Sequence, residues 1–258
     1  LKTFAQARDL IYIDPAVLDV ARSWIVQHQN ADGSFDPVGF IHHQEMLGGL
    51  QGKTALTAYL AVALHEAGES EASGRAIRYL EGALKPGDDV YTLALSAYAL
   101  ELAKSPAAAA AYDRLLKAAK ESDGGLYWGD EPVQPLPQRE DEIGLPEPGR
   151  SAAVETTGYA LLALTEHGDR MNASRAACWL VSQRNAYGGY DSTQDTVVGL
   201  QALTRFAADN KADVDATVTL RAGDWSKVLK VTPENVDVLQ TVDVPVGGRL
   251  TVEAQGKG

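Results

Sequence analysis

The feature that most constrains the fold of this chain is an alternation between two kinds of apolar segment. After Asp14-Pro15, a favourable helix start, apolar residues recur at three- and four-residue steps, which is typical of a helix with one buried face. That face is expected to carry Val17, Val20, Ala21, Trp24 and Ile25. Thr54–Ala67, by contrast, is apolar or small on nearly every side, as in a helix surrounded by protein.

The alternation continues along the chain. The one-faced pattern returns at Gly74–Leu84 and Pro106–Glu121, and the pattern that is apolar all round returns at Tyr91–Ala103 and Val154–Leu164. A fourth pair is expected at Ala173–Arg184 and Thr196–Ala208. One-faced helices suit an outer layer, and helices without a polar face suit an inner layer that the outer one covers. The sequence therefore predicts an all-α fold, an α/α toroid with two concentric layers of helices.

An internal repeat supports the two-layer prediction. A constant offset of 155 residues (179 − 24 = 155) relates Trp24, Asn30, Gly33 and Phe35 to Trp179, Asn185, Gly188 and Tyr190. An offset that is kept through a helix and the turn after it indicates a duplicated unit, as expected of a repeat array.

Two segments interrupt the helical pattern. Asp123–Arg150 holds five of the eleven prolines and the acidic run Glu140–Glu142, so we expect a solvated surface loop there. After about Ala212 the apolar period becomes two, which predicts short strands at residues 214–220, 228–231, 236–242 and 249–254. We therefore expect a helical domain at 1–210 and, at 211–258, part of a β-domain whose other strands lie outside this chain.

Composition and charge limit the possible partners. The 258 residues carry a net charge of −12, which disfavours nucleic acid because a phosphate backbone would be repelled. No apolar run is long enough to span a membrane, and Leu1–Phe4 has neither a start methionine nor a signal-like core, so we expect a fragment of a longer protein. The only cysteine, Cys178, permits no disulfide within the chain, and its helical context predicts a small buried side chain.

Ile41–Leu50 holds the densest group of chemically useful side chains. It contains His42, His43 and Glu45, and a neutral imidazole can act as a base or as a nucleophile. A polar loop whose histidines cap neighbouring elements is the alternative that the residues alone leave open.

Two further positions are candidates for function. Asp195 lies in a polar cluster in which Ser192 or Thr193 is a credible N-cap, so Asp195 is either a helix-dipole partner or a catalytic carboxylate. Asn172 begins an Asn-Ala-Ser glycosylation sequon. The sequence has no phosphate loop, no Gly-x-Ser-x-Gly elbow and no zinc-binding helix, and we expect neither a cofactor nor a metal.

Four strings carry a resemblance to a known family. Ile41–Leu50, Ala55–Tyr59, Val154–Leu162 and Gly188–Val198 resemble, in order and spacing, the thioester domain of the complement and alpha-macroglobulin superfamily. The resemblance covers about Leu10 to Ala208, and the tail is similar to strands of the CUB domain into which that thioester domain is inserted. It implies a toroid of six helical hairpins, truncated here at its N-terminus.

The resemblance also implies a mechanism. Members store a thioester between a cysteine and a glutamine of a Gly-Cys-Gly-Glu-Gln motif, and a histidine at the position of His43 attacks it to give an acyl-imidazole and a thiolate. A hydroxyl of a target surface then takes the acyl group. Glu45 is expected to orient or polarise the imidazole, whereas His42 lies one position early. The thioester motif is absent from this sequence and Cys178 lies in the wrong context, so this chain by itself should form no covalent bond.

The function that the resemblance implies is that of a secreted, extracellular protein of innate immunity. Its expected partners are hydroxyl-bearing surfaces, protein receptors or regulators, and the rest of its own precursor. It would be a single-turnover, self-transacylating protein rather than a turnover enzyme. The alternatives are a protease-trapping alpha-macroglobulin, a terpenoid cyclase or prenyltransferase with the same α/α toroid, and a purely structural scaffold.

Overall fold

The computed structural model describes most of the chain. It covers residues 1–39, 52–85, 87–130, 153–190, 192–210, 214–235, 240–245 and 249–257. The chain divides into two compact units, Leu1–Leu203 and Thr204–Gly258, and each is considered by itself.

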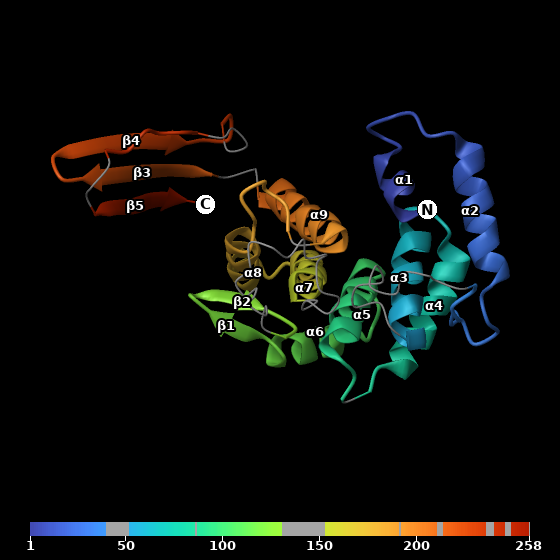
Figure 1. Cartoon of the computed structure of the whole chain (residues 1–258). Helices are drawn as coiled ribbons and strands as arrows, with labels where there is room; N and C mark the ends of the chain where they lie inside the picture. Colours follow the sequence, from blue (N-terminus) through green and yellow to red (C-terminus); the bar gives the residue numbers. More distant parts are fainter. Residues whose placement is uncertain are drawn as a thin grey trace, which may run out of the picture. The chain divides into compact units, whose positions relative to one another are not determined.

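The described residues of the first unit form helices and one small β-hairpin (Figure 1). The helices are α1 (Lys2–Ala7), α2 (Pro15–Gln27), α3 (Gly52–Glu66), α4 (Ser70–Ala83), α5 (Val90–Leu102), α6 (Ala108–Lys117), α7 (Ala153–His167), α8 (Arg170–Ser182) and α9 (Thr193–Asn210), the last of which continues into the second unit. The hairpin joins β1 (Lys120–Ser122) to β2 (Gly125–Tyr127).

The helices of this unit form an inner and an outer layer. Helix α5 packs between α3 and α7 and is buried continuously from Tyr91 to Leu100. Its outer partner α6 buries only one side, at Ala108, Ala111, Tyr112 and Leu115. The same contrast holds for α3 with α4 and for α7 with α8. The predicted alternation of helix types is confirmed.

The internal repeat is present in the backbone as well as in the sequence. The bounds of α2 shifted by 155 are those of α8 (15 + 155 = 170; 27 + 155 = 182). Gly33 donates its N–H to the carbonyl of Asn30 and Gly188 donates to Asn185, both at 2.9 Å. Both glycines have a positive φ, +89° and +84°. The turn that follows each outer helix is therefore the same.

Helix α2 contradicts the expectation that its apolar stripe is buried. Its predicted N-cap is confirmed, since Asp14 Oδ1 accepts a hydrogen bond from the N–H of Ala16 at 2.9 Å. Yet α2 has no buried residue, and Val20 is 71% exposed and Trp24 52% exposed. The pattern of the stripe is correct for an outer helix, but no described residue covers it.

Two other expectations for this unit are wrong. Cys178 is exposed rather than buried, because α8 turns Ala176, Ala177 and Leu180 toward the inner layer and Cys178 away from it. The segment expected to form a loop from Asp123 onward begins with packed structure instead.

The packed part of that segment is the strand β2 and the residue after it. Gly125–Tyr127 is a buried strand, and Trp128 is fully buried with its indole N–H donating 2.7 Å to the carbonyl of Leu115. The prolines and acidic residues at 131–150 lie outside the described residues.

The second unit contains a three-stranded antiparallel sheet. Its strands β3 (Asp215–Ala222), β4 (Trp225–Val231) and β5 (Leu250–Lys257) are ordered β4-β3-β5. Three of the four predicted strands are thus confirmed. The fourth, predicted at 236–242, is not: residues 236–239 lie outside the description, and 240–242 are not a strand.

Candidate functional site

The candidate site begins at the first turn of the inner helix α3. The N–H of Phe35 donates 3.0 Å to Thr57 Oγ1, and the Lys53 ammonium lies 3.3 Å from Asp36 Oδ1. These contacts join the chain before residue 40 to the helix after residue 51. We call these contacts the base of the connection between residues 36 and 53. The predicted site residues His42, His43 and Glu45 belong to this connection and lie outside the described residues.

The base of the connection is polar and charged. The Asn30 amide donates 2.9 Å to Asp36 Oδ2, and this hydrogen bond, followed by Lys53, lowers the pKa of Asp36. Thr57 Oγ1 in turn donates 2.7 Å to the carbonyl of Lys53. The ion pair between Asp36 and Lys53 therefore joins the two flanks of the connection.

The same hydrogen bond recurs at the helices α7 and α9. The N–H of Trp128 donates to Thr157 Oγ1 on α7, and the N–H of Tyr190 donates to Thr196 Oγ1 on α9, each at 3.0 Å. The aromatic residue and the threonine are 29 and 6 positions apart in these cases, against 22 for Phe35 and Thr57.

Two of these three connections are long: one carries the histidine-bearing segment and the other the proline-rich segment. Both therefore begin and end at the N-terminal ends of inner helices. This relation was not predicted from the sequence, although a threonine within the first two turns of each of α3, α7 and α9 was its visible signal.

A buried polar cluster lies among the inner helices. Lys2 is 7% exposed, and its ammonium donates 2.9 Å to Gln201 Oε1. It also lies 5.6 Å and 5.7 Å from the ring centres of Tyr59 and Tyr159. Burial lowers the pKa of Lys2 to about 8, against the opposing attraction of acidic groups that include Glu155.

Glu155 is the buried acid of this cluster. It is 3% exposed and its Oε1 accepts a 2.8 Å hydrogen bond from the Tyr91 hydroxyl. Burial, strengthened by neighbouring Tyr159 and Glu155, raises the pKa of Tyr91 far above its usual value, so the phenol stays protonated and donates. Neither Lys2 nor Glu155 was singled out in the sequence, because each lies alone among apolar residues.

Asp195 links the first turns of two helices. The predicted N-cap Ser192 donates its hydroxyl 2.6 Å to Asp195 Oδ2 and accepts from the Asp195 N–H at 3.0 Å. Asp195 Oδ1 accepts from the N–H of Glu155 at 3.1 Å. One carboxylate thus joins the first turns of α9 and α7, and this structural role explains the residue.

Asn172 lies in the first turn of α8 and is half-buried. Its N–H and its Nδ2 donate 3.1 Å and 2.7 Å to the carboxylate of the helix cap Asp169. The same carboxylate accepts a short hydrogen bond from the Tyr112 hydroxyl. The sequon residue is partly exposed, and its side-chain amide is held by the cap.

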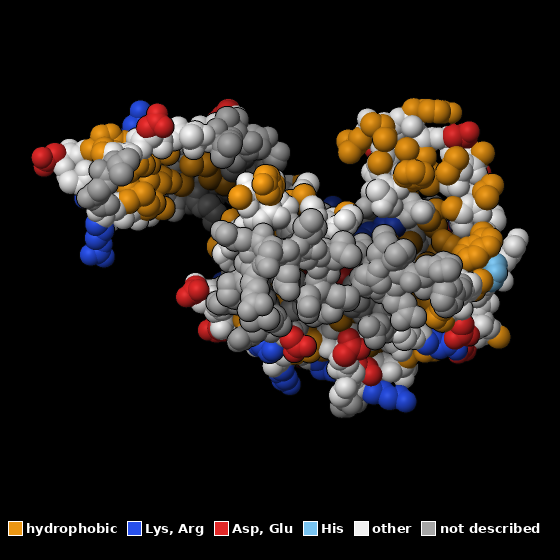
Figure 2. Space-filling model, viewed as in Figure 1, with side chains coloured by type: hydrophobic (Ala, Val, Ile, Leu, Met, Phe, Trp, Pro, Cys, Tyr) orange, Lys and Arg blue, Asp and Glu red, His pale blue; other side chains and the backbone are white. Residues whose placement is uncertain are grey.

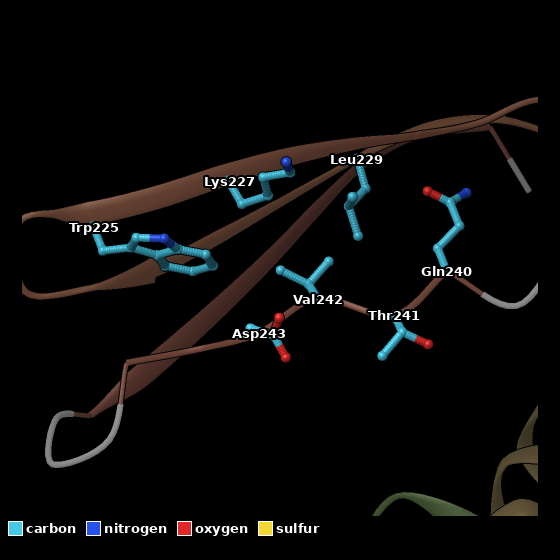
Figure 3. Close-up of a pocket in the computed structure, with 7 residues that line it drawn as sticks. All are labelled: Trp225, Lys227, Leu229, Gln240, Thr241, Val242 and Asp243. Carbon is cyan, nitrogen blue, oxygen red and sulfur yellow. The ribbon is translucent and has the colours of Figure 1, made fainter.

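The second unit contains a groove of its own (Figure 3). Trp225, Lys227 and Leu229 lie on one side, on β4, and Gln240–Asp243 faces them. One ammonium and one carboxylate among apolar and amide groups offer no paired acid and base. Within the described ranges there is no cluster of metal-binding side chains and no helix that could cross a membrane.

Comparison with known proteins defines the family. Residues 1–206 match the A-macroglobulin TED domain. The chain belongs to this family of complement and alpha-macroglobulin thioester domains, whose fold is the predicted α/α toroid. The alternative of a terpenoid cyclase or prenyltransferase is not supported.

The relatives extend over the whole chain. Complement C3 of Eptatretus burgeri is 35% identical over 274 residues, ovostatin of Gallus gallus 36% over 270, and complement C3 of Lethenteron camtschaticum 30% over 279. Each covers all of this chain, which spans 16%, 18% and 16% of the respective relative. The chain is thus similar to a short part of complement-like thioester proteins, which are not turnover enzymes.

Proposed function

We propose that this chain is the acyl-transfer part of a complement-like thioester protein, with His43 as the nucleophile. The proposal is supported most by one structural observation. The connection that carries His43 is held at both flanks, by Phe35 with Thr57 and by Asp36 with Lys53, in a domain of the thioester family. Nucleophilic catalysis requires a positioned imidazole, and these contacts fix the points at which the connection leaves and rejoins the described structure.

The proposed transfer has two steps. A neutral imidazole nitrogen of His43 attacks the acyl carbon of a cysteine–glutamine thioester, the C–S bond breaks, and the sulfur leaves as a thiolate. A hydroxyl of the target then attacks the acyl-imidazole, its proton passes to the thiolate, an ester forms and the imidazole is released. The thioester pair must come from another part of the intact protein, and each thioester reacts once.

Glu45 has a supporting role in this proposal. A carboxylate that accepts a hydrogen bond from one imidazole nitrogen fixes the tautomer and leaves the other nitrogen free to attack. We assign nucleophilic attack to His43 rather than His42, because His43 directly precedes the Gln44-Glu45-Met46 part of the family string.

The proposed setting is extracellular. The partners would be hydroxyl-bearing surfaces, which receive the ester, and protein receptors or regulators that recognise the bound domain. Glycosylation of Asn172 is part of the same proposal, since its side chain is accessible at the start of α8 and one amide hydrogen suffices for the bond to Asp169.

The test uses the intact protein after proteolytic activation. Radiolabelled glycerol and methylamine report transfer to a hydroxyl and to an amine. We expect His43→Asn to lose glycerol coupling and keep methylamine coupling, and Glu45→Gln to lower glycerol coupling less. His42→Asn is the matched control and should behave as wild type. If His43→Asn coupled to glycerol and methylamine in the same proportion as wild type, His43 would not be the nucleophile.

A protease-trapping role remains the second candidate. The chain is 36% identical to ovostatin and 35% identical to complement C3 of Eptatretus burgeri, so sequence similarity favours neither the protease-trapping nor the complement-like role. Acceptor preference separates them in the assay above, because coupling to amines alone would favour the alpha-macroglobulin alternative.

A further inference from the structure

Helix α2 presents an apolar face that no described residue covers. Figure 2 shows hydrophobic side chains gathered over α1 and α2, and Val17, Val20 and Trp24 of α2 are all exposed. Apolar patches of this kind mark interaction surfaces. The repeated units show what kind of structure lies on the corresponding face of the outer helices α4 and α8.

On α4 and α8 the corresponding face is covered by a glycine turn. A Cβ added to Gly33 would lie 2.2 Å from the carbonyl oxygen of Arg75 on α4. A Cβ added to Gly125 would lie 3.3 Å from the carbonyl oxygen of Arg175 on α8 and 2.8 Å from the Cβ of Trp179. In both cases the turn precedes the inner partner of the covered helix, which is α3 for α4 and α7 for α8.

The two covered helices also hold the turn by an arginine. Arg75 Nε donates 2.8 Å to Gln29 Oε1, and Arg175 Nε donates 3.1 Å to the carbonyl of Gly124. Arg175 also forms a 2.9 Å ion pair with Glu121 of the hairpin. The turn is thus fixed by close backbone contact and by side-chain hydrogen bonds.

Helix caps place α2 in register with these helices. The N-caps of α2, α4 and α8 are Asp14, Glu69 and Asp169. Val20 lies six residues after its N-cap (14 + 6 = 20), as Arg75 and Arg175 lie six residues after theirs. The position of Trp24 is likewise that of Trp179 (14 + 10 = 24; 169 + 10 = 179).

The two tryptophans differ in their surroundings. Trp179 is 4% exposed because Tyr127 of the hairpin stacks on it with ring centres 5.0 Å apart. Trp24 is 52% exposed and has a tilted ring contact with His28 of its own helix end. The exposed face of α2 therefore carries a tryptophan at the position that the hairpin covers on α8, but no described residue covers it.

We propose that this face docks a glycine-containing turn of the same polypeptide that precedes α1 in the intact protein. The turn would lie against the backbone at Val20, as the turns at Gly33 and Gly125 lie against their arginines. Because valine replaces arginine, the contact would be apolar and would need no acidic partner such as Glu121. This inference does not depend on the proposed acyl transfer.

Hydroxyl-radical footprinting of the intact, monomeric protein tests the proposal. Oxidation at each aromatic residue is read by peptide mass spectrometry, with buried Trp179 as the protected reference and Tyr187, 99% exposed, as the open one. We expect Trp24 to be oxidised as slowly as Trp179. Oxidation of Trp24 at a rate comparable with Tyr187 would overturn the proposal.

Two variants test whether protection of Trp24 depends on a turn that docks at Val20. Val20→Asp would place a charge under the turn and should raise oxidation of Trp24. Ser23→Asp is the matched control, because its counterparts Arg78 and Cys178 stay exposed on the covered helices. Protection of Trp24 that appears only at high protein concentration, together with a dimer in sedimentation, would identify a second copy as the occupant and would also overturn the proposal.

Discussion

The backbone N–H of Phe35 donates a 3.0 Å hydrogen bond to the side chain of Thr57, a residue 22 positions further along the chain. Phe35 and Thr57 are both buried, so water cannot replace the threonine oxygen. Because the same bond joins Trp128 to Thr157, it is a general device by which a turn is fixed to an inner helix.

Replacing these threonines by valine should test the device. Thr57→Val keeps the shape but leaves the Phe35 N–H without an acceptor in the core, which should cost about 1–3 kcal/mol of unfolding free energy. Thr157→Val should cost a similar amount. Thr196→Val should cost less, because Thr196 is half-buried and water can reach the site.

Urea unfolding followed by circular dichroism measures these differences. Thr54→Val, at a half-buried position in the first turn of α3, serves as the control and should change the midpoint little. Equal losses at all four positions would show that helix propensity, rather than the hydrogen bond, determines the effect.

The contact between Gly33 and α4 gives a second prediction. Gly33→Ala should destabilise the fold by more than the roughly 1–2 kcal/mol that a positive φ alone costs a residue with a Cβ. Its Cβ would also lie 2.2 Å from the carbonyl oxygen of Arg75. Gly68→Ala isolates the first term, since Gly68 has a φ of +77° and open space around it. Similar melting temperatures for the two variants would contradict a tight turn-to-helix contact.

The exposed thiol gives a third prediction. Cys178 should react with a disulfide reagent in the folded chain to the same extent as in urea, because it lies on the outer surface of α8. Cys178→Ser should change stability by less than about 0.5 kcal/mol, as is usual for surface substitutions. If the thiol reacted only after unfolding, Cys178 would be buried, as its helical context in the sequence predicted.

The layers of the fold could be predicted from the sequence, because a helix that is buried on all sides has no polar face. The segment Tyr91–Ala103 has no polar face, and α5 is buried from Tyr91 to Leu100. The packing of individual side chains was less predictable. Trp24 and Trp179 occupy equivalent positions of their helices, and their exposure differs because the hairpin covers only Trp179. Cys178 is exposed because it lies on the side of α8 that faces away from the inner layer.

The candidate site was only partly predictable for a related reason. His43 and Glu45 were found from a family string, and that string lies in a connection outside the described residues. The threonine bond at its base and the polar cluster around Lys2 depend on contacts between residues far apart, such as Lys2 with Gln201. A pattern read along one segment does not contain such contacts.

The buried ammonium of Lys2 should make stability depend on pH. Its folded-state pKa of about 8 lies below the ordinary value of 10.5, since burial disfavours the charged form. Between these values the unfolded chain binds more protons than the folded chain, so stability should rise as pH rises from about 8 to 10.5. The difference in pKa corresponds to roughly 3 kcal/mol.

Lys2→Met isolates this contribution. The variant has no charge to bury, so its advantage over wild type should be largest at pH 7.5 and should shrink as the pH rises toward 10.5, because wild-type Lys2 is then neutral in the folded chain and loses its proton in the unfolded chain as well. Ionisation of tyrosines in the unfolded chain affects both proteins equally and cancels in the difference. Lys117→Met, at an exposed position of α6, should show no such trend. If urea unfolding gave Lys2→Met a pH-independent difference from wild type, Lys2 would have an ordinary pKa and the cluster around it would be open to water.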